Sequence, residues 1–249
     1  MPYFLSKPMS ESVPPLWREG APYQRQVVYD GCGPDSNPAS PPVHYDSHLL
    51  KPHSLTHADA PSHVIHNGKT IDHFFNSDSR PSSLWGKATV IQFDMSDFTP
   101  CSEVGYEDHF IFRVSKEKLI QKLFNLTGSA LPPSRLLISA SAIPTHPHIG
   151  HDPKWILVLE EAAAEWLISH PNFVTFGTSW KSTDFNPTSR DRPIHTILFR
   201  SALIFECLDL MEVPEGDYFF VGIPLRIEGA SESPVCPILL KKEELAWAD

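Results

Sequence analysis

The stretch His53-Ser54-Leu55-Thr56-His57-Ala58-Asp59-Ala60-Pro61-Ser62-His63 carries the densest chemical information in this chain. It holds three histidines and one aspartate within eleven residues, and all four lie at odd positions. In an extended backbone, side chains two residues apart point to the same face. We therefore predict that His53, His57, Asp59 and His63 converge on one side of a strand, or of a loop at a strand end.

The same spacing leaves a helix open, because His53 and His57 are four residues apart. Ser54, Thr56 and Pro61 favour the extended alternative. Neutral imidazoles together with a carboxylate form a borderline donor set that suits Zn²⁺, Mn²⁺ or Fe²⁺. A histidine-rich surface strand without a ligand is the other interpretation, and convergence of the four side chains on one face favours the metal site.

Length and composition exclude several classes of protein. The chain has 249 residues, 30 acidic and 20 basic, with a formal charge of -10 and a pI of about 5.7. A net acidic surface repels phosphate backbones, so we expect no nucleic-acid partner. No apolar run reaches the ~18–20 residues of a bilayer span, and the first residues lack a signal-peptide layout. We therefore expect a soluble, cytoplasmic protein with no membrane partner. Four cysteines are widely separated and are expected to be free thiols: Cys32, Cys101, Cys207 and Cys236.

Patterns of apolar residues predict an α/β fold. Residues Lys87–Asp94 are typical of a buried strand. A helix is predicted to begin at Ser115 and to end at Gly128, and Leu157–Ser169 is predicted as a second helix. Strands alternate with a few helices, hairpins are expected near both ends, and no linker divides the chain. The sequence therefore predicts a single domain over residues 1–249.

The residues around the histidines resemble a known family. The segment His53–His63 is similar to the H-x-G-T-H-x-D-x-P-x-H signature of the metal-dependent cyclase family, which includes bacterial-type kynurenine formamidase and isatin hydrolase. Every position of the signature matches except its glycine, which is Leu55 here. Four further stretches are similar to family elements in the same order: Leu5–Trp17, Asn67–Asp72, Phe176–Asp184 and Pro224–Gly229.

This resemblance implies a cyclase-like (swivelling β/β/α) fold of one domain, with a mixed central sheet, few helices and terminal β-hairpins. It also implies a metal centre that holds one or two ions of Zn or Mn. The ligands that the resemblance implies come from the motif and from two distant positions: His53, His57, Asp59, His195 and Glu206.

Geometry limits how His195 and Glu206 can meet at one centre. An unbroken helix between them would separate them by ~16 Å along its axis, too far for one metal ion. We therefore expect the helix to end near Ser201 and Leu203–Phe205 to return as a strand that delivers Glu206. Taken alone, the two residues could equally be a solvated histidine and a surface glutamate, and the resemblance favours the ligand role.

The resemblance implies a hydrolase that acts on the C–N bond of a small molecule, either an aryl formamide or a cyclic amide. In this hypothesis a metal-activated water attacks the carbonyl, and His63 shuttles the proton to the leaving nitrogen. Trp17 is expected to form an aromatic wall for a flat substrate, or else to pack within the protein. Two other classes stay open: a non-catalytic small-molecule-binding member of the same fold, and a metal-dependent lyase or dehydratase. Because family members associate, a homo-dimer or tetramer is expected.

Departures from the family pattern concern the pocket. Leu55 adds bulk beside the ligands and requires a backbone with negative φ. Trp17-Arg18-Glu19 replaces the family's W-P-G, and Ser139-Ala140-Ser141 replaces a T-G-W-like stretch. The cluster His146–His151 is predicted to be a surface loop that serves as a lid or contacts substrate, in preference to a second metal site.

Overall fold

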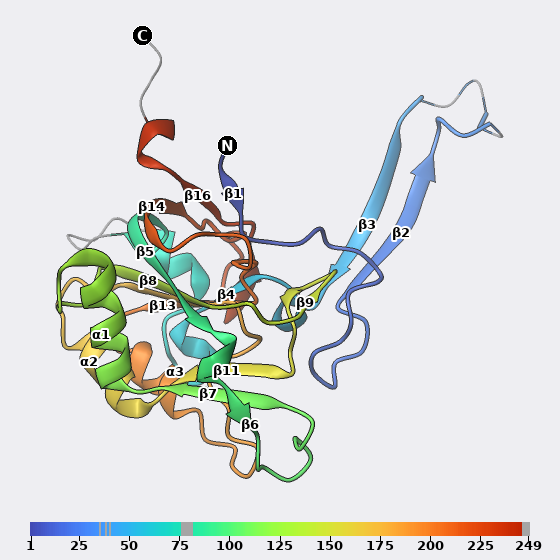
Figure 1. The fold of residues 1–249 in the computed structure, drawn as a ribbon. Coiled ribbons are helices and arrows are strands. Elements are labelled where there is room, and N and C mark those ends of the chain that lie inside the picture. The colour runs from blue at the N-terminus through green and yellow to red at the C-terminus, as the bar shows by residue number, and fades with distance from the viewer. Residues whose placement is uncertain (35, 38, 40, 76–81, 246–249) are drawn as a thin grey trace.

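The computed structural model describes residues 1–245 apart from 35, 38, 40 and 76–81, and its centre is a nine-stranded sheet (Figure 1). In spatial order the strands are β1 (Tyr3–Phe4), β16 (Ile238–Leu240), β14 (Gly216–Val221), β5 (Trp85–Asp94), β8 (Arg135–Ser141), β12 (Thr175–Thr178), β13 (Leu203–Glu206), β4 (His57–Asp59) and β15 (Glu232–Pro234). Strands β5, β8, β12 and β13 run parallel, and the outer strands join them in antiparallel register. The predicted α/β class with a mixed central sheet is confirmed.

Helices cover one face of this sheet (Figure 1). The α-helices of the described residues, few as predicted, are α1 (Lys116–Thr127), α2 (Glu161–Ile168) and α3 (Pro193–Leu198). Leu119, Ala163 and Leu198, one from each helix, are buried in a core that also holds Phe93 and Phe176 of the sheet. A smaller sheet adds to this core, with strands β6 (Thr99–Pro100), β7 (Phe110–Val114) and β11 (Trp155–Leu159).

Local signals set the ends of α1. The Ser115 hydroxyl accepts a hydrogen bond from Lys118 N at 3.2 Å, and Gly128 ends the helix with a φ of 73°. The second predicted helix is wrong over its first residues, because Trp155–Leu159 form strand β11 and the helix is Glu161–Ile168. β11 pairs in parallel with β7, a distant partner that overrides the local helical pattern.

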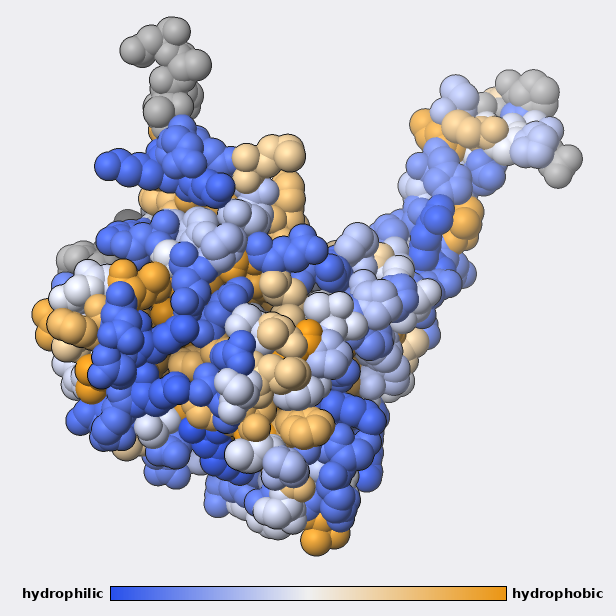
Figure 2. Space-filling model, in the orientation of Figure 1, coloured by the Kyte–Doolittle hydropathy of each residue, from blue (hydrophilic) through white to orange (hydrophobic). Residues whose placement is uncertain are grey.

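Strands β2 (Tyr23–Asp30) and β3 (His44–Leu50) form a hairpin that stands away from the rest of the chain (Figure 1). We call β2 and β3 together the arm. Most of its side chains are exposed, and Figure 2 shows apolar residues among polar ones along it. β3 leads directly into the histidine-rich motif, so the arm and the candidate site are adjacent in the chain.

Short elements complete the described fold: η1 (Pro52–Ser54), η2 (Pro61–His63), η3 (Ile71–Phe75), η4 (Met95–Asp97), η5 (Lys242–Glu244), β9 (Thr145–His146) and β10 (Gly150–His151). All four cysteines are free, as predicted. Within the described ranges, no helix has the length and apolar character that crossing a membrane requires.

Candidate metal centre

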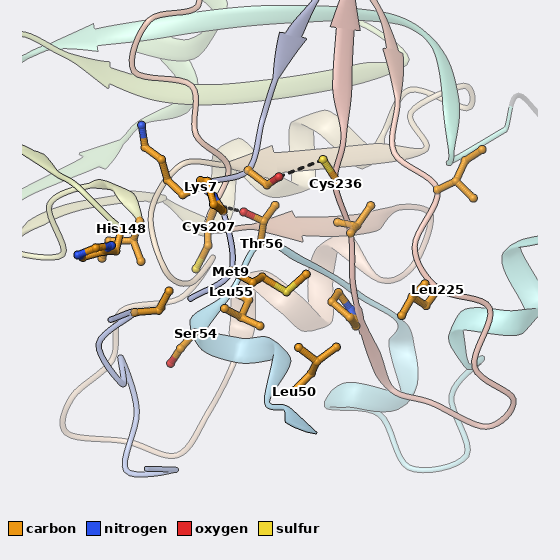
Figure 3. Close-up of a pocket in the computed structure, with 17 residues that line it drawn as sticks. Lys7, Met9, Leu50, Ser54, Leu55, Thr56, His148, Cys207, Leu225 and Cys236 are labelled. Carbon is orange, nitrogen blue, oxygen red and sulfur yellow. Dashed lines mark hydrogen bonds between the residues drawn. The ribbon is translucent and has the colours of Figure 1, made fainter. Parts of the chain in front are cut away.

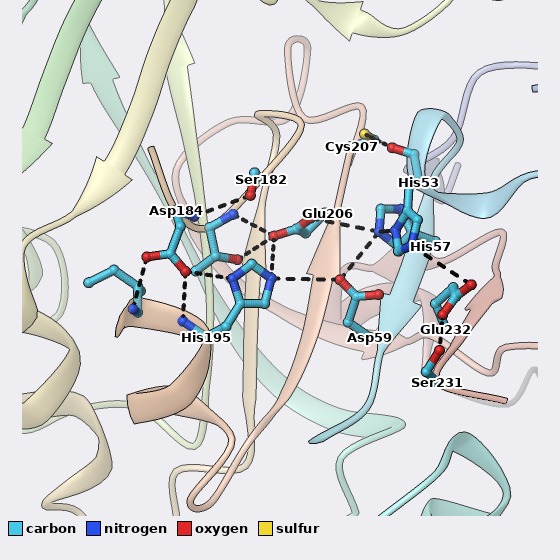
Figure 4. A network of polar contacts seen from close by, with 12 residues as sticks. His53, His57, Asp59, Ser182, Asp184, His195, Glu206, Cys207, Ser231 and Glu232 are labelled. Atoms are coloured by element: carbon cyan, nitrogen blue, oxygen red, sulfur yellow. Dashed lines mark hydrogen bonds and ion pairs between the residues drawn. The ribbon is translucent and has the colours of Figure 1, made fainter. Parts of the chain in front are cut away.

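The candidate centre is built around β4, whose two neighbours bring acidic side chains alongside it. β4 lies between β13 and β15 and is antiparallel to both. The register places Glu206 opposite His57 and Glu232 opposite Asp59. Side chains directly opposite each other in a ladder share a face. Residues distant in sequence are therefore gathered on one side of the sheet (Figure 4).

The motif reaches this face with a backbone that only partly follows the predicted extended strand. His57 and Asp59 lie on β4 as predicted, but His53 lies on the 3₁₀ turn η1 and His63 on the 3₁₀ turn η2. A proline begins each turn, because its fixed φ suits the first helical position. The rings still converge: the ring centroid of His53 lies 5.1 Å from that of His57 and 4.8 Å from that of His63.

The two distant residues arrive by the predicted route. α3 ends at Leu198, the chain turns, and β13 carries Glu206 back beside β4. His195 and Glu206 are buried, with 2% and 3% of their surface exposed. The predicted break of the helix near Ser201 is confirmed, and it is this break that lets the two side chains meet.

The donor atoms of the centre lie close together. His57 Nε2 is 3.4 Å from Asp59 Oδ2 and 3.7 Å from Glu206 Oε2. His195 Nε2 is 3.8 Å from the same Asp59 oxygen and 3.3 Å from Glu206 Oε1. His53 Nδ1 lies 3.4 Å from His57 Nε2. Two ligand atoms that bind the same zinc ion in a tetrahedral site are separated by ~3.3 Å. The distances between these donor atoms therefore suit a shared ion.

Hydrogen bonds behind the rings orient their donor nitrogens. His57 Nδ1 donates to the carbonyl of Leu55 at 2.8 Å, so Nε2 carries the lone pair that faces the centre. His195 Nδ1 donates to Asp184 Oδ2 at 2.7 Å. Asp184 also accepts from the backbone N–H groups of Ile194 and His195, at 2.9 and 3.0 Å. A carbonyl or carboxylate behind the ring is the usual outer partner of a metal-ligating histidine.

Several buried polar atoms here have no hydrogen-bond partner in the described part of the chain. They are both carboxylate oxygens of Asp59 and Nε2 of His195. The ion-pair contacts of Asp59 and Glu206 within the described residues are all to histidines, with no lysine or arginine. Two buried carboxylates beside an unpaired imidazole nitrogen favour the binding of a cation. The residues present therefore fit a divalent metal such as Zn²⁺ or Mn²⁺.

Charges within the centre shift its pKa values in opposite directions. Burial opposes protonation of His57, but the Asp59 carboxylate outweighs it and holds the pKa of His57 well above its ordinary value. For His195, burial is outweighed by Glu206 and Asp184, and its pKa is also raised. The pKa of Asp59 is lowered well below its usual range, because the histidines outweigh the effect of burial. The Asp59 carboxylate therefore stays ionised and attracts positive charge.

His63 is set apart from the other histidines by its environment. It is half-buried, and its ring centroid lies 5.6 Å from that of His195. Burial lowers the pKa of His63, and the neighbouring His195 and His53 lower it further against the opposing charge of Asp59. A neutral imidazole at the edge of the centre can accept a proton near pH 7.

Trp17 lies against the motif and is partly exposed. Its indole Nε1 donates to the carbonyl of His53 at 3.1 Å, and 36% of its surface is exposed. The ammonium of Lys181 lies 4.4 Å from the Trp17 ring centroid and donates to the carbonyl of Leu16 at 3.1 Å. The indole is thus fixed beside the ligand segment, and its role as a substrate wall stays a prediction.

Leu55 is accommodated without strain. Its φ of -113° and ψ of 170° lie in the extended region that any residue adopts. Its side chain is 5% exposed and packs with Val13 and Ile149 in a small apolar cluster. The predicted negative φ is confirmed, and the bulk of Leu55 enters this cluster.

The cluster His146–His151 folds as a hairpin of β9 and β10. The prediction of a surface loop is wrong for His151, which is 3% exposed. Its Nε2 donates to the carbonyl of Trp155 at 2.5 Å, and its Nδ1 accepts from the hydroxyl of Ser179 at 2.7 Å. Burial lowers the pKa of His151 to about 4. The ring is therefore a neutral core group.

Two residues of the centre were missed by reasoning from sequence. Glu232 Oε1 lies 3.8 Å from His53 Nε2, and these two residues with His63 form a further group that could hold a metal. No sequence signal marks Glu232, because its position depends on the pairing of β15 with β4. Asp184 is the last residue of Phe176–Asp184, a stretch that resembles the family. This resemblance was the sequence signal available for Asp184, which accepts the hydrogen bond from His195 Nδ1.

The fold and the site together define a class: an α/β protein with a candidate metal centre of histidines and carboxylates on one face of a mixed sheet. The chain belongs to the Cyclase family, because the model of that family, described as "Putative cyclase", matches residues 3–185. The predicted family membership is confirmed.

Individual relatives agree with this assignment. The kynurenine formamidase of Polaromonas naphthalenivorans (strain CJ2) is 28% identical over 201 residues, which are 80% of this chain and 75% of that protein. The structure of a novel cyclase is similar with a TM-score of 0.68 and 18% identity, over 97% of this chain and 88% of that one. Isatin hydrolase A from Ralstonia solanacearum has a TM-score of 0.65 and 20% identity, over 97% of this chain and 92% of that one. These likenesses confirm the cyclase-like fold.

Proposed function

We propose that this protein is a metal-dependent hydrolase of non-peptide C–N bonds, with an aryl formamide or a cyclic amide as substrate. The observation that carries the proposal is the convergence of buried imidazoles and carboxylates whose donor atoms include three without a hydrogen-bond partner among the described residues. The relative named kynurenine formamidase supports the formamide as substrate class. A cyclic amide has the same bond and needs the same chemistry.

We assign five residues as metal ligands: His53, His57, Asp59, His195 and Glu206. Their mutual distances and the unpaired atoms of Asp59 and His195 support one or two ions of Zn or Mn. His53 is 30% exposed, so the centre is open on its side. A divalent metal bound here would supply Lewis acidity to a water and to the substrate carbonyl.

We assign proton transfer, orientation of His195 and substrate binding to three further residues of this chain. His63 takes a proton from the attacking water and gives it to the leaving nitrogen, because its lowered pKa keeps it neutral near pH 7. Asp184 holds the ring of His195 in orientation through Nδ1. The exposed ring of Trp17 stacks on the flat part of the substrate. For a formamide, the water oxygen bonds to the formyl carbon and the C–N bond breaks, which yields formate and an aryl amine.

Elemental analysis with a chelator-treated and reloaded protein tests the metal first. The wild-type chain should bind one or two equivalents of Zn²⁺ or Mn²⁺, and His57→Ala should bind none. His66→Ala is the matched control, because His66 is exposed and outside the centre. A wild-type chain that takes up neither metal would contradict the ligand assignment.

Product analysis tests the reaction. Loaded protein should convert a neutral aryl formamide into formate that contains one oxygen from ¹⁸O-labelled water. A lyase or dehydratase incorporates no such oxygen, and a binding protein forms no product. Either outcome with a metal-loaded protein would contradict hydrolysis while leaving the metal site in place.

Location and assembly complete the proposal. We propose a cytoplasmic, homo-oligomeric enzyme whose partner is a small-molecule substrate. Four free cysteines support a reducing compartment, and the exposed arm supports association with another chain.

A further inference from the structure

The three histidines assigned as ligands present different ring nitrogens to the centre. His57 and His195 face it with Nε2, because Nδ1 of each donates to an acceptor behind the ring, at 2.8 and 2.7 Å. His53 faces it with Nδ1, which lies 3.4 Å from His57 Nε2. An imidazole that binds a metal through one nitrogen carries its proton on the other nitrogen. His53 therefore needs an acceptor for a proton on Nε2.

Glu232 is the carboxylate beside this outer nitrogen. Its Oε1 lies 3.8 Å from His53 Nε2, and Figure 4 shows the pair at the edge of the centre. The ladder of β15 and β4 sets this position, because it places Glu232 opposite Asp59. The Ser231 hydroxyl donates to the other oxygen, Oε2. Glu232 is thus held through one carboxylate oxygen and faces His53 with the other.

The remaining sides of His53 are taken up by different contacts. Its carbonyl accepts a hydrogen bond from the Trp17 indole Nε1 at 3.1 Å. A cavity of about 460 Å³ lies next to the motif, and its lining includes Ser54, Leu55 and Thr56 (Figure 3). His53 itself is not part of this lining, so its ring nitrogens are directed elsewhere.

We propose that Glu232 is a positioning residue: it accepts a hydrogen bond from Nε2–H of His53 and thereby makes Nδ1 the nitrogen that binds the metal. The inference rests on the proposed ligand role of His53. A carboxylate behind a metal-ligating histidine fixes the ring and increases the basicity of the ligating nitrogen. Glu232 then takes the part that Asp184 has behind His195.

The exposure of His53 makes this outer partner important. The side chain of His53 is 30% exposed, whereas His57 and His195 are buried and fixed by their surroundings. A hydrogen bond needs a shorter separation than 3.8 Å. We expect His53 and Glu232, both partly exposed, to close this distance when a metal on Nδ1 polarises Nε2–H, because polar contacts of a site often tighten in its complex.

Two other roles for Glu232 are less well supported. Donor atoms of Glu232, His53 and His63 lie within 4.8 Å of one another, so Glu232 could orient His63 or bind a metal itself. The ion pair, however, is formed with His53. The carboxylates assigned as ligands, Asp59 and Glu206, are buried, while the side chain of Glu232 is 25% exposed. These contacts favour the positioning role.

Metal affinity tests the inference. Glu232→Ala should bind as many zinc ions as the wild type but ~10–100-fold more weakly, measured by competition with a chromogenic chelator. Glu232→Gln should recover part of this loss, because its amide oxygen still accepts from Nε2–H. Glu228→Ala is the matched control, since Glu228 is exposed and lies outside the centre. Unchanged circular dichroism shows that each variant is folded.

NMR of the zinc-loaded protein, labelled with ¹⁵N-histidine, identifies the ring nitrogen that carries the proton. Long-range ¹H–¹⁵N spectra of the wild type should show His53 with zinc on Nδ1 and a proton on Nε2, and the loss of these signals in His53→Gln assigns them. In Glu232→Ala the His53 signals should disappear or divide between two ring states. A residue with a merely structural role would leave this ring state unchanged.

Each contrary result has a distinct meaning. A wild-type His53 that binds zinc through Nε2 would overturn the inference and make Glu232 a candidate ligand. A zinc affinity of Glu232→Ala equal to that of the control would also overturn it, and a reduced kcat in that variant would then assign Glu232 to the orientation of His63. Both results leave the proposed hydrolase in place, whereas a wild-type chain that binds no metal would contradict the two proposals together.

Discussion

Glu206 and His57 stand directly opposite each other on neighbouring strands, and 3.7 Å separates Glu206 Oε2 from His57 Nε2. The other carboxylate oxygen of Glu206 accepts hydrogen bonds from the backbone N–H and the hydroxyl of Thr183. Glu206 is thus held from behind by one chain segment while it faces β4 with its free oxygen. The centre depends on this pairing of strands as much as on the identity of the side chains.

Replacing Glu206 with alanine should abolish tight metal binding. We expect a loss in affinity of more than about 100-fold, because removal of an outer partner alone costs ~10–100-fold. Competition with a chromogenic chelator measures it. Glu212→Ala is the control, since Glu212 is exposed and outside the centre, and equal affinities in the two variants would remove Glu206 from the ligand set.

His63→Ala should keep the metal and lose turnover. A positioned acid–base group contributes ~10²–10⁴-fold to the rate, so kcat should fall by that factor while the metal content stays at the wild-type value. Steady-state kinetics together with elemental analysis of the same sample check both halves. Full activity of His63→Ala on every substrate that the wild type accepts would refute the proton-transfer role.

Asp184→Asn should weaken metal binding without removing a ligand. The substitution keeps the shape but loses the carboxylate charge that the His195 Nδ1–H faces at 2.7 Å. We expect the metal affinity to fall ~10–100-fold, to a value between that of the wild type and that of Glu206→Ala. Chelator competition is again the measurement, with the exposed Asp191→Asn as control, and an affinity equal to that of the control would show that Asp184 has no positioning role.

Leu55→Gly, which restores the family's residue, should destabilise this protein. Leu55 is buried against Val13 and Ile149 and its φ is negative, so glycine adds a cavity and backbone entropy without relieving strain. We expect a loss of about 3–5 kcal/mol in the free energy of unfolding. Urea denaturation measures it, and the metal content of the folded variant should not rise. A more stable variant would mean that Leu55 is strained after all.

His151 should make stability depend on pH. Its pKa is lowered from the ordinary value of 6.5 to about 4 by burial. Between pH 4 and pH 6.5, His151 binds a proton in the unfolded chain but not in the folded chain. The contribution of neutral His151 to stability therefore falls as the pH drops below 6.5. At pH 5 the loss is about 2 kcal/mol.

Urea denaturation of the wild type and of His151→Gln at pH 7.5 and pH 5 measures this contribution. Glutamine does not titrate, so the stability advantage of the wild type should shrink by that amount at the lower pH. An advantage that stays constant would contradict the neutral, buried state of His151.

Sequence reasoning succeeded where local constraints are strong. Alternation on a strand predicted that His57 and Asp59 share a face, and the distance limit of a helix predicted the break between His195 and Glu206. It failed where a distant partner decides. Glu232 reaches the centre only through the register of β15 on β4. Buried His151 accepts a hydrogen bond from Ser179 and donates one to the carbonyl of Trp155. Neither partner is visible in the local pattern.

The position of β4 between β13 and β15 has a consequence for how the protein is made. A growing chain displays all three motif histidines before β5, β8 and β12, but the strand that carries Glu206 and the strand that begins at Glu232 are synthesised after them. Until β13 has emerged, β4 has no neighbour on either side, and its second neighbour follows only with β15. Loading of the proposed centre with metal therefore has to wait for β13 and β15, and a product truncated before β13 would carry the signature motif without an assembled centre.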